Sequence, residues 1–106
     1  MKVTSSEIAF PAGAAANILK ALAQRHRLAI VCQLLAGERS VGELAGMLGL
    51  RDSNVSQHLA LLRRNGVVRA RRERQTVRYG IASLEARQIV ETLHMLYCAP
   101  DPAQPC

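Results

Sequence analysis

The spacing of the apolar residues changes twice along this chain, and this double change restricts the fold more than any other feature. As far as Asn65, apolar residues recur every three or four positions, as they do on one face of an α-helix. Between Val68 and Ile81 they alternate with polar residues, which is typical of β-strands. Helical spacing returns from Leu84 to Tyr97. The sequence therefore predicts a mostly α domain with a single β-hairpin and no internal repeat.

Two of the expected helices form a closely spaced pair. We expect helices over residues 14–23, 24–36, 40–48 and 52–65 before the hairpin, and one over 84–97 after it. Ser40 and Glu43 have the spacing of a capping box, and Gly49 suits the left-handed residue that ends a helix. The third and fourth helices are then joined by only three residues, 49–51. Two short helices joined by such a turn are typical of a helix-turn-helix.

The domain boundaries follow from the same pattern. We expect a flexible lead-in over residues 1–13, one domain over 14–98 with the hairpin tip at 72–75, and an irregular, proline-containing tail over 99–106. No uninterrupted apolar run approaches the roughly 20 residues that a membrane span needs. The first residues do not resemble a targeting segment, so the expected location is cytoplasmic.

Arginine dominates the charge of the chain. Twelve of its 14 basic residues are Arg, against eight acidic residues, and the net charge is +6. Seven of these arginines lie between Arg63 and Arg78, where Glu73 is the only acid. Such a segment repels itself unless an anion compensates it, so we expect double-stranded DNA as partner. The alternative is a generic basic surface, or an adaptor that binds an acidic protein.

The expected DNA contacts come from two places. Short polar side chains occupy the start of the fourth helix and suit base edges and phosphates in a major groove. The arginines follow at the end of that helix and in the hairpin. The candidate residues are Ser53, Asn54, Ser56, Gln57, His58, Arg63, Arg64, Arg72, Arg74 and Gln75. No nucleophile–base pair, glycine-rich phosphate loop or carboxylate pair is evident, so we expect neither an enzyme nor a cofactor.

These residues also carry a family resemblance. The segments Ser40–Ala45 (SVGELA) and Val55–Val68 (VSQHLALLRRNGVV) resemble the ArsR/SmtB family of winged-helix repressors, and the resemblance extends over residues 15–98. It implies a winged helix-turn-helix, a homodimer built from the first and last helices, and an inverted-repeat operator that is released when an inducer is sensed.

The resemblance also bears on the inducer. The cysteine cluster and the paired Asp, His and Glu ligands of the family's metal sensors are missing, so no metal site is expected. Cys32 in the second helix and Cys98 at the end of the last helix resemble the thiol-based, persulfide-responsive branch. That branch implies a disulfide or polysulfide bridge between the two cysteines, formed by reactive sulfur species or oxidants. The alternative is a metal-responsive or inducer-independent repressor in which Cys32 is a small buried core residue. The sequence assigns no role to Cys106.

Overall fold

The first helix, α1 (Ala12–Leu22), begins two residues earlier than expected. Pro11 precedes it, and the Pro11 carbonyl accepts a hydrogen bond from the Ala15 amide at 3.0 Å. Gly13 was interpreted as part of the lead-in, but a glycine in the first helical turn costs only about 1 kcal/mol and is tolerated here. The computed structural model describes residues 10–98, so the rest of the expected lead-in and the tail lie outside the described residues.

The second helix, α2 (Arg25–Leu34), is shorter than the expected segment 24–36. Gln24 stands before it as the N-cap, and its side-chain oxygen accepts hydrogen bonds from the amides of His26 and Arg27, both at 2.9 Å. The helix ends at Leu34, and the residues that follow turn toward the sheet.

The closely spaced pair is confirmed as α3 (Val41–Leu48) and α4 (Asp52–Arg64). The capping box is present: the Glu43 amide donates to Ser40 Oγ at 3.1 Å, and the Ser40 amide donates to Glu43 Oε1 at 2.9 Å. Gly49 follows α3 with a φ of 66°, a left-handed conformation that glycine adopts without steric cost. This turn redirects the chain at once into α4.

The sheet contains one strand more than expected. Strand β1 (Arg39–Ser40) pairs antiparallel with β3 (Thr76–Ile81), which pairs antiparallel with β2 (Val68–Glu73), giving the order β1-β3-β2. A strand of two residues shows no alternation, so the pattern could not reveal it. Arg72 lies within β2, so the hairpin tip is narrower than residues 72–75 and consists of Arg74 and Gln75.

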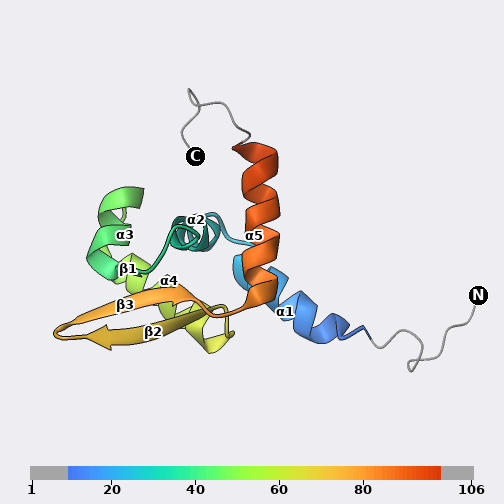
Figure 1. Ribbon diagram of the computed structural model, residues 1–106, viewed down its shortest axis with the longest axis horizontal. Helices are drawn as coiled ribbons and strands as arrows, with labels where there is room; N and C mark the ends of the chain where they lie inside the picture. Colours follow the sequence, from blue (N-terminus) through green and yellow to red (C-terminus); the bar gives the residue numbers. More distant parts are fainter. Residues whose placement is uncertain (1–9, 99–106) are drawn as a thin grey trace, which may run out of the picture.

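The last helix, α5 (Leu84–Tyr97), has the expected bounds. The core lies where α2, α3, α4, α5 and the base of the sheet meet. Its fully buried large side chains are Ile30, Val31, Leu34, Leu44, Val55, Leu59, Leu62, Val67 and Val90. Figure 1 shows that α5 stands upright on one side of this core and that the β2–β3 hairpin projects from the other. The architecture is the expected winged helix-turn-helix, with β2–β3 as the wing. Within residues 10–98, no helix is long and apolar enough to cross a membrane.

Candidate DNA interface and thiol cavity

The first two turns of α4 present a polar surface. The inward side of α4 is apolar, with Val55 and Leu59 fully buried. Because these positions fix the rotation of the helix, the intervening polar side chains point outward. The exposed neutral polar residues at this end are Ser53, Asn54, Ser56 and Gln57, and the acidic Asp52 is exposed at the first position of the helix. They can approach a nucleic acid without any change in the fold.

His58 differs from the other residues in the α4 set because it is half-buried against α2. Its ring centroid lies 5.8 Å from that of His26, with the two rings tilted. Burial lowers the pKa of His58, and the positive charge of Arg27 and the nearby His26 lower it further. The neutral ring is therefore favoured, and its contact with His26 packs α4 against α2.

The two candidate arginines of α4 line a groove that reaches the wing at Tyr79. Arg63 and Arg64 are exposed at the end of α4 and line a groove of about 440 Å³ together with Ser56, Ala60 and Tyr79. Tyr79 was not predicted as a site residue. The signal that could have identified it is the period of two in the strand, which places Tyr79 on the same face of the wing as its cross-strand neighbour Ala70 and as Arg72.

The tip of the wing is held in an unusual conformation. Arg74 has a φ of 59°, and it is the only non-glycine residue with a positive φ in the described part of the chain. Tight hairpin turns require this conformation and normally use Gly, Asn or Asp for it. The turn therefore displays Arg74 and Gln75 at the most distant point of the wing, and both are exposed.

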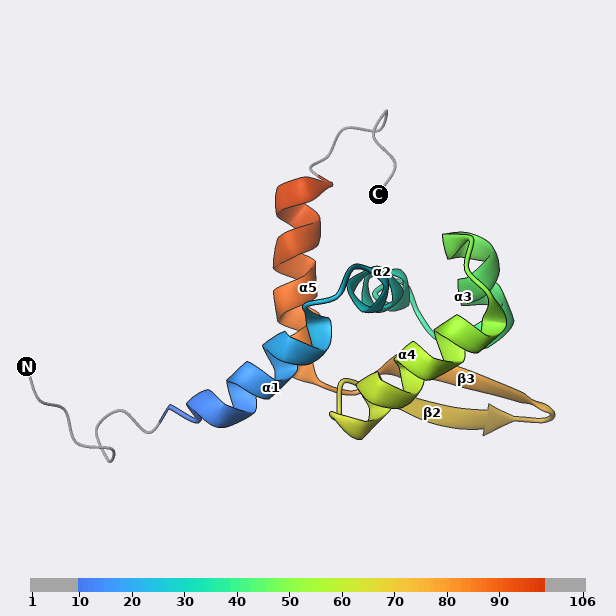
Figure 2. The ribbon, with the colours of Figure 1, turned by 180° about the vertical axis from the view of Figure 1, so that it is seen from behind.

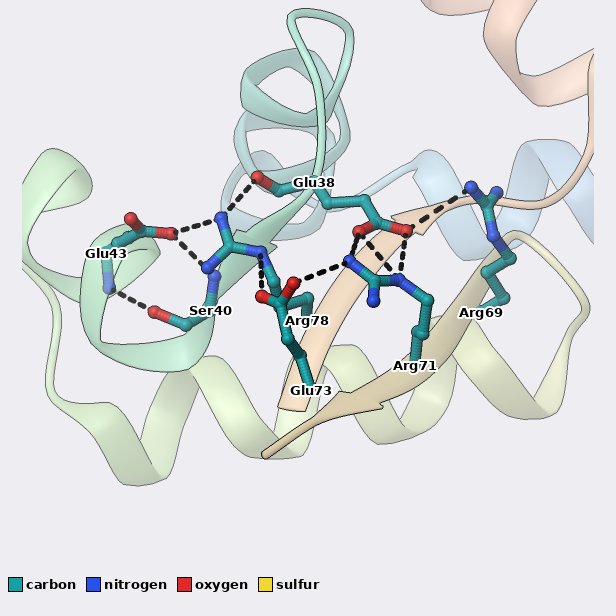
Figure 3. Close-up of polar contacts among 7 residues, drawn as sticks. All are labelled: Glu38, Ser40, Glu43, Arg69, Arg71, Glu73 and Arg78. Atoms are coloured by element: carbon teal, nitrogen blue, oxygen red, sulfur yellow. Dashed lines mark hydrogen bonds and ion pairs between the residues drawn. The ribbon is translucent and has the colours of Figure 1, made fainter. Parts of the chain in front are cut away.

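The other three arginines of the basic segment are neutralised, which corrects the sequence-based interpretation. Arg71 donates to Glu38 at 2.6 Å (Nη2 to Oε1), and Arg78 donates to Glu43 at 3.3 Å (Nη2 to Oε1). Arg69 approaches Glu38 at 3.5 Å. Figure 3 shows these contacts, which join the wing to Glu38 in the segment between α2 and α3 and to Glu43 in the first turn of α3. The compensating acids lie some 30 positions earlier in the chain, so a count over residues 63–78 could not find them.

The two cysteines identified from the sequence border one cavity. Cys32 lies in α2, and Cys98 is the C-cap of α5, where its amide donates to the His94 carbonyl at 2.7 Å. The cavity has a volume of about 380 Å³. Its lining is mostly apolar and includes Leu28, Ala29, Leu48, Val90 and Leu93, with Arg25, Gln33 and His94 as polar members. α2 and α5 thus bring together two residues that are 66 positions apart in sequence.

Partial burial beside the cavity affects the pKa of the Cys32 thiol. Desolvation raises the pKa of this thiol above its ordinary value, so less thiolate is present at neutral pH. Cys32 is a free thiol and Cys98 takes part in a disulfide, so the two are not bonded to each other in this structure. Cys106 lies outside the described residues. Among residues 10–98, no group of three or more His, Cys, Asp or Glu side chains is arranged to hold a metal ion.

Large apolar side chains are exposed along α1 and α5. Figure 2 shows these two helices crossing on the side of the molecule away from the wing tip. The exposed residues on and beside them are Phe10, Leu19, Leu84, Met95, Leu96 and Tyr97, each more than half exposed. Helix α5 thus buries Ala86 and Val90 and leaves Leu84 at its start and Met95, Leu96 and Tyr97 at its end uncovered.

Comparison with known proteins identifies the family. Residues 24–70 match the family model described as the bacterial regulatory protein, arsR family. The chain is 53% identical to the transcriptional activator HlyU of Vibrio cholerae over 81 residues, which cover 76% of this chain and 75% of that protein. It is 42% identical to the biofilm growth-associated repressor of Agrobacterium fabrum over 86 residues, which cover 81% of this chain and 74% of that protein.

Solved structures agree with these matches. Reduced HlyU from Vibrio cholerae superposes with a TM-score of 0.80 at 50% identity, covering 82% of this chain and 92% of that one. The homodimeric winged helix-turn-helix DNA-binding domain of a Mycobacterium bovis protein gives a TM-score of 0.74 at 31% identity, covering 91% and 89%. From its helix-turn-helix, its wing and these relatives, the chain belongs to the arsR family of DNA-binding transcriptional regulators.

Proposed function

We propose that this regulator is a repressor that binds an inverted-repeat operator as a homodimer and releases it when Cys32 and Cys98 become covalently bridged. The observation that carries the proposal is the shared cavity: Cys32 in α2 and Cys98 at the end of α5 border the same apolar space, and no residue of α4 lines it. Sensing and DNA binding would then use different surfaces of one small domain.

The DNA-binding half rests on α4 and the wing. The exposed side chains of Ser53, Asn54, Ser56 and Gln57 would enter the major groove, and Arg63 and Arg64 would bind phosphates beside it. Arg72, Arg74 and Gln75 on the wing would reach the adjacent backbone or minor groove. His58 was included in this set, but its packing against α2 supports a role in positioning α4.

The dimer rests on the uncovered apolar surface of α1 and α5. A contiguous apolar surface on a small domain marks an interaction site, and a two-fold dimer is the commonest arrangement of such surfaces. Pairing through α1 and α5 leaves α4 and the wing free. It also sets the separation of the two α4 helices, which must match one turn of DNA, about 34–36 Å.

The bridging step balances with an organic persulfide as oxidant. In the reduced protein, Cys32 accepts the outer sulfur of the persulfide, and the organic thiol leaves. The Cys98 thiolate then attacks the Cys32 Sγ, the Cys32–Cys98 bond forms, and hydrogen sulfide departs. Two protein thiols are thereby oxidised by two electrons, which reduce the persulfide. Because Cys98 is disulfide-bonded in this structure, the reaction is to be started from the fully reduced chain.

A bridge between α2 and α5 would act on the proposed dimer helix directly. Cys98 caps the end of α5, and α2 packs against both α5 and α4. Tying the end of α5 to α2 changes how α5 is presented to its partner, and with it the spacing of the two α4 helices. Coupling between two sites of a protein typically changes the affinity for a ligand about 5- to 150-fold, and we expect a loss of DNA affinity in this range for the bridged dimer.

The test measures operator affinity before and after persulfide treatment. Fluorescence anisotropy with a duplex from the chain's own promoter should show tight binding by the reduced protein and weaker binding after treatment. Cys32→Ser and Cys98→Ser should bind as the reduced protein does and lose the response, whereas Cys106→Ser is the matched control and should keep it. Intact mass spectrometry and peptide mapping should locate the new bond between Cys32 and Cys98.

A second candidate function has one observation in its favour. The raised pKa of Cys32 is what burial gives to an inert core thiol, which suits an inducer-independent repressor. That alternative predicts operator binding that no cysteine substitution and no persulfide alters. A response that requires a stoichiometric metal ion would instead indicate a metal-responsive repressor.

A further inference from the structure

We infer that Glu38 is a positioning residue that fixes the direction of the wing, and that full DNA affinity depends on this carboxylate although it lies on a basic surface. The inference rests on the proposed DNA contacts of Arg72 and Arg74. Its basis is a set of polar contacts, called here the clasp, formed by Glu38 and Glu43 with Arg69, Arg71, Glu73 and Arg78 (Figure 3).

The register of the wing assigns its arginines to opposite faces. Arg71 is paired across the strands with Arg78, and Arg69 with Gly80, so these side chains share one face. Arg72, paired with Val77, belongs to the other face. Two arginines directly opposite each other repel, so the face that holds Arg71 and Arg78 requires acids nearby. Glu38 supplies the closest one.

Glu38 makes the tightest contacts of the clasp. Its Oε1 accepts from Arg71 Nη2 at 2.6 Å and from Arg71 Nε at 3.1 Å, so the guanidinium binds through two of its nitrogens. Its backbone carbonyl accepts from Arg78 Nη2 at 3.1 Å. Planar two-point contacts of this kind fix orientation as well as distance. One residue therefore holds both strands of the wing.

The close approach of Arg69 depends on a glycine. A Cβ at Gly80 would lie 3.2 Å from Arg69 Nη2 and 3.2 Å from Glu38 Cγ. Without that atom, Arg69 crosses the face of β3, where it also donates to the Ile81 carbonyl. The strand thus leaves space for the clasp at the place where a side chain would block it.

The outer half of the wing has little other support. Strand β1 pairs with β3 only at Tyr79 and Arg78, so residues 72–77 extend beyond it as a two-stranded ribbon. Two-stranded ribbons are marginally stable and vary widely in twist. Glu38 binds Arg71, and this arginine directly precedes the ribbon in β2. A small change in the direction of the strands at Arg71 therefore produces a larger displacement of Arg74 at the tip, which carries the proposed phosphate contact.

The direction in which DNA affinity changes when Glu38 is replaced makes the inference testable. On charge alone, removing a carboxylate from a basic surface strengthens DNA binding. A positioning role predicts the opposite, because the wing arginines would no longer meet the backbone together. For Glu38→Gln we expect operator affinity about tenfold lower. The slope of log affinity against log salt should be shallower by about 1 to 2, since each phosphate that is no longer bound reduces the slope by roughly 0.9.

The experiment uses the full chain and anisotropy titrations at several salt concentrations, with Asp101→Asn as the control. Asp101 belongs to neither α4, the wing nor the proposed dimer helices, so its substitution removes one carboxylate from none of the proposed contacts. Arg74→Ala is measured alone and combined with Glu38→Gln. It should cost clearly less affinity in the Glu38→Gln background, because there the wing no longer engages the DNA. Hydrogen exchange of the amides of residues 72–77 should be faster in free Glu38→Gln.

The outcomes separate this inference from the proposed function. Equal or tighter binding by Glu38→Gln with an unchanged salt slope overturns the positioning role while the repressor proposal stands. No effect of Arg74→Ala in the otherwise unaltered chain overturns it too, because the wing then makes no contact. No salt-dependent binding by the unaltered chain contradicts the proposed function itself. If Glu38→Gln does not fold, Glu38→Asp, which keeps the charge and shortens the reach, provides the same measurements.

Discussion

The two faces of the wing use the same residue type for different purposes. One face carries Arg69, Arg71 and Arg78, and its guanidinium groups contact Glu38, Glu43 and Glu73. The other, called here the open face, carries Arg72, and among the described residues Arg72 and Arg74 have no ion pair. Positive charge close in sequence is therefore divided by strand geometry into a structural set and a set available to a ligand.

The comparison teaches that charge counts along a sequence overestimate a binding surface. Seven arginines within 16 residues suggest a uniform clamp for DNA. In the folded chain three of them are held by acids, so the ligand meets a smaller number at defined positions. The number of phosphates bound, and with it the salt dependence, follows from the free set.

The largest expected effect is on the open face. Replacing both Arg72 and Arg74 by Ala should lower operator affinity by at least about tenfold and make the salt slope shallower by about 1.8, at roughly 0.9 for each phosphate that is no longer bound. The melting temperature should hardly change, because neither side chain makes an ion pair within residues 10–98. A large loss of stability without loss of affinity would reverse the roles assigned to the two faces.

A smaller effect, of a different kind, is expected on the clasp face. Arg71→Gln breaks the contact with Glu38 and should lower the melting temperature by a few degrees at most, since exposed ion pairs contribute little. Operator affinity should also fall, but less than in the double variant on the open face. Arg72→Gln is the matched control, with the same charge change on the neighbouring residue and the opposite face. Equal melting temperatures for the two would show that the clasp adds nothing to stability.

Most of the fold followed from local sequence rules, and the clasp did not. The capping box at Ser40 and Glu43, the turn at Gly49 and the bounds of α5 are set by neighbours in sequence, so pattern reasoning found them. Glu38 contacts Arg71 across 33 positions, and β1 has only two residues. Such long-range contacts leave no periodic signal. The same reason explains why His58 was assigned to DNA although the structure places it against His26.

For the thiol cavity, the family resemblance was more informative than the residue pattern. Burial of Cys32 in α2 could be read from its apolar stripe, but the shared cavity with Cys98 depends on how α2 packs on α5. Helix packing of this kind is set by many side chains together. Tyr79, beside Arg63 and Arg64, was missed because its neighbours come from α4.

Lowering the pH should weaken the ion pairs of Glu38 and Glu43 on the clasp face. Hydrogen bonding by Arg71 lowers the pKa of Glu38 below its ordinary value of 4.5, and the amide of Ser40 does the same for Glu43. A carboxylate with a lowered pKa in the folded state contributes stability that is fully present above pH about 4.5 and is lost as pH falls through the folded pKa. The stability difference between the unaltered chain and Glu38→Gln should therefore shrink below that pH, as measured by denaturant unfolding. A difference that stays constant down to about pH 3 would show that the Glu38 charge is not what stabilises the wing.

The smallest expected effect is at the tip, where the two faces meet. Arg74 holds a φ of 59°, which costs a non-glycine residue about 1–2 kcal/mol, and glycine would remove that cost while losing about 0.5–1 kcal/mol to chain entropy. Arg74→Gly should therefore raise the melting temperature by a few degrees and still weaken operator binding, because it removes one cation. Arg74→Ala is the control, since it removes the same cation and keeps the strained φ. If Arg74→Gly melts no higher than Arg74→Ala, the turn stores no strain, and the tip presents Arg74 without a cost to the fold.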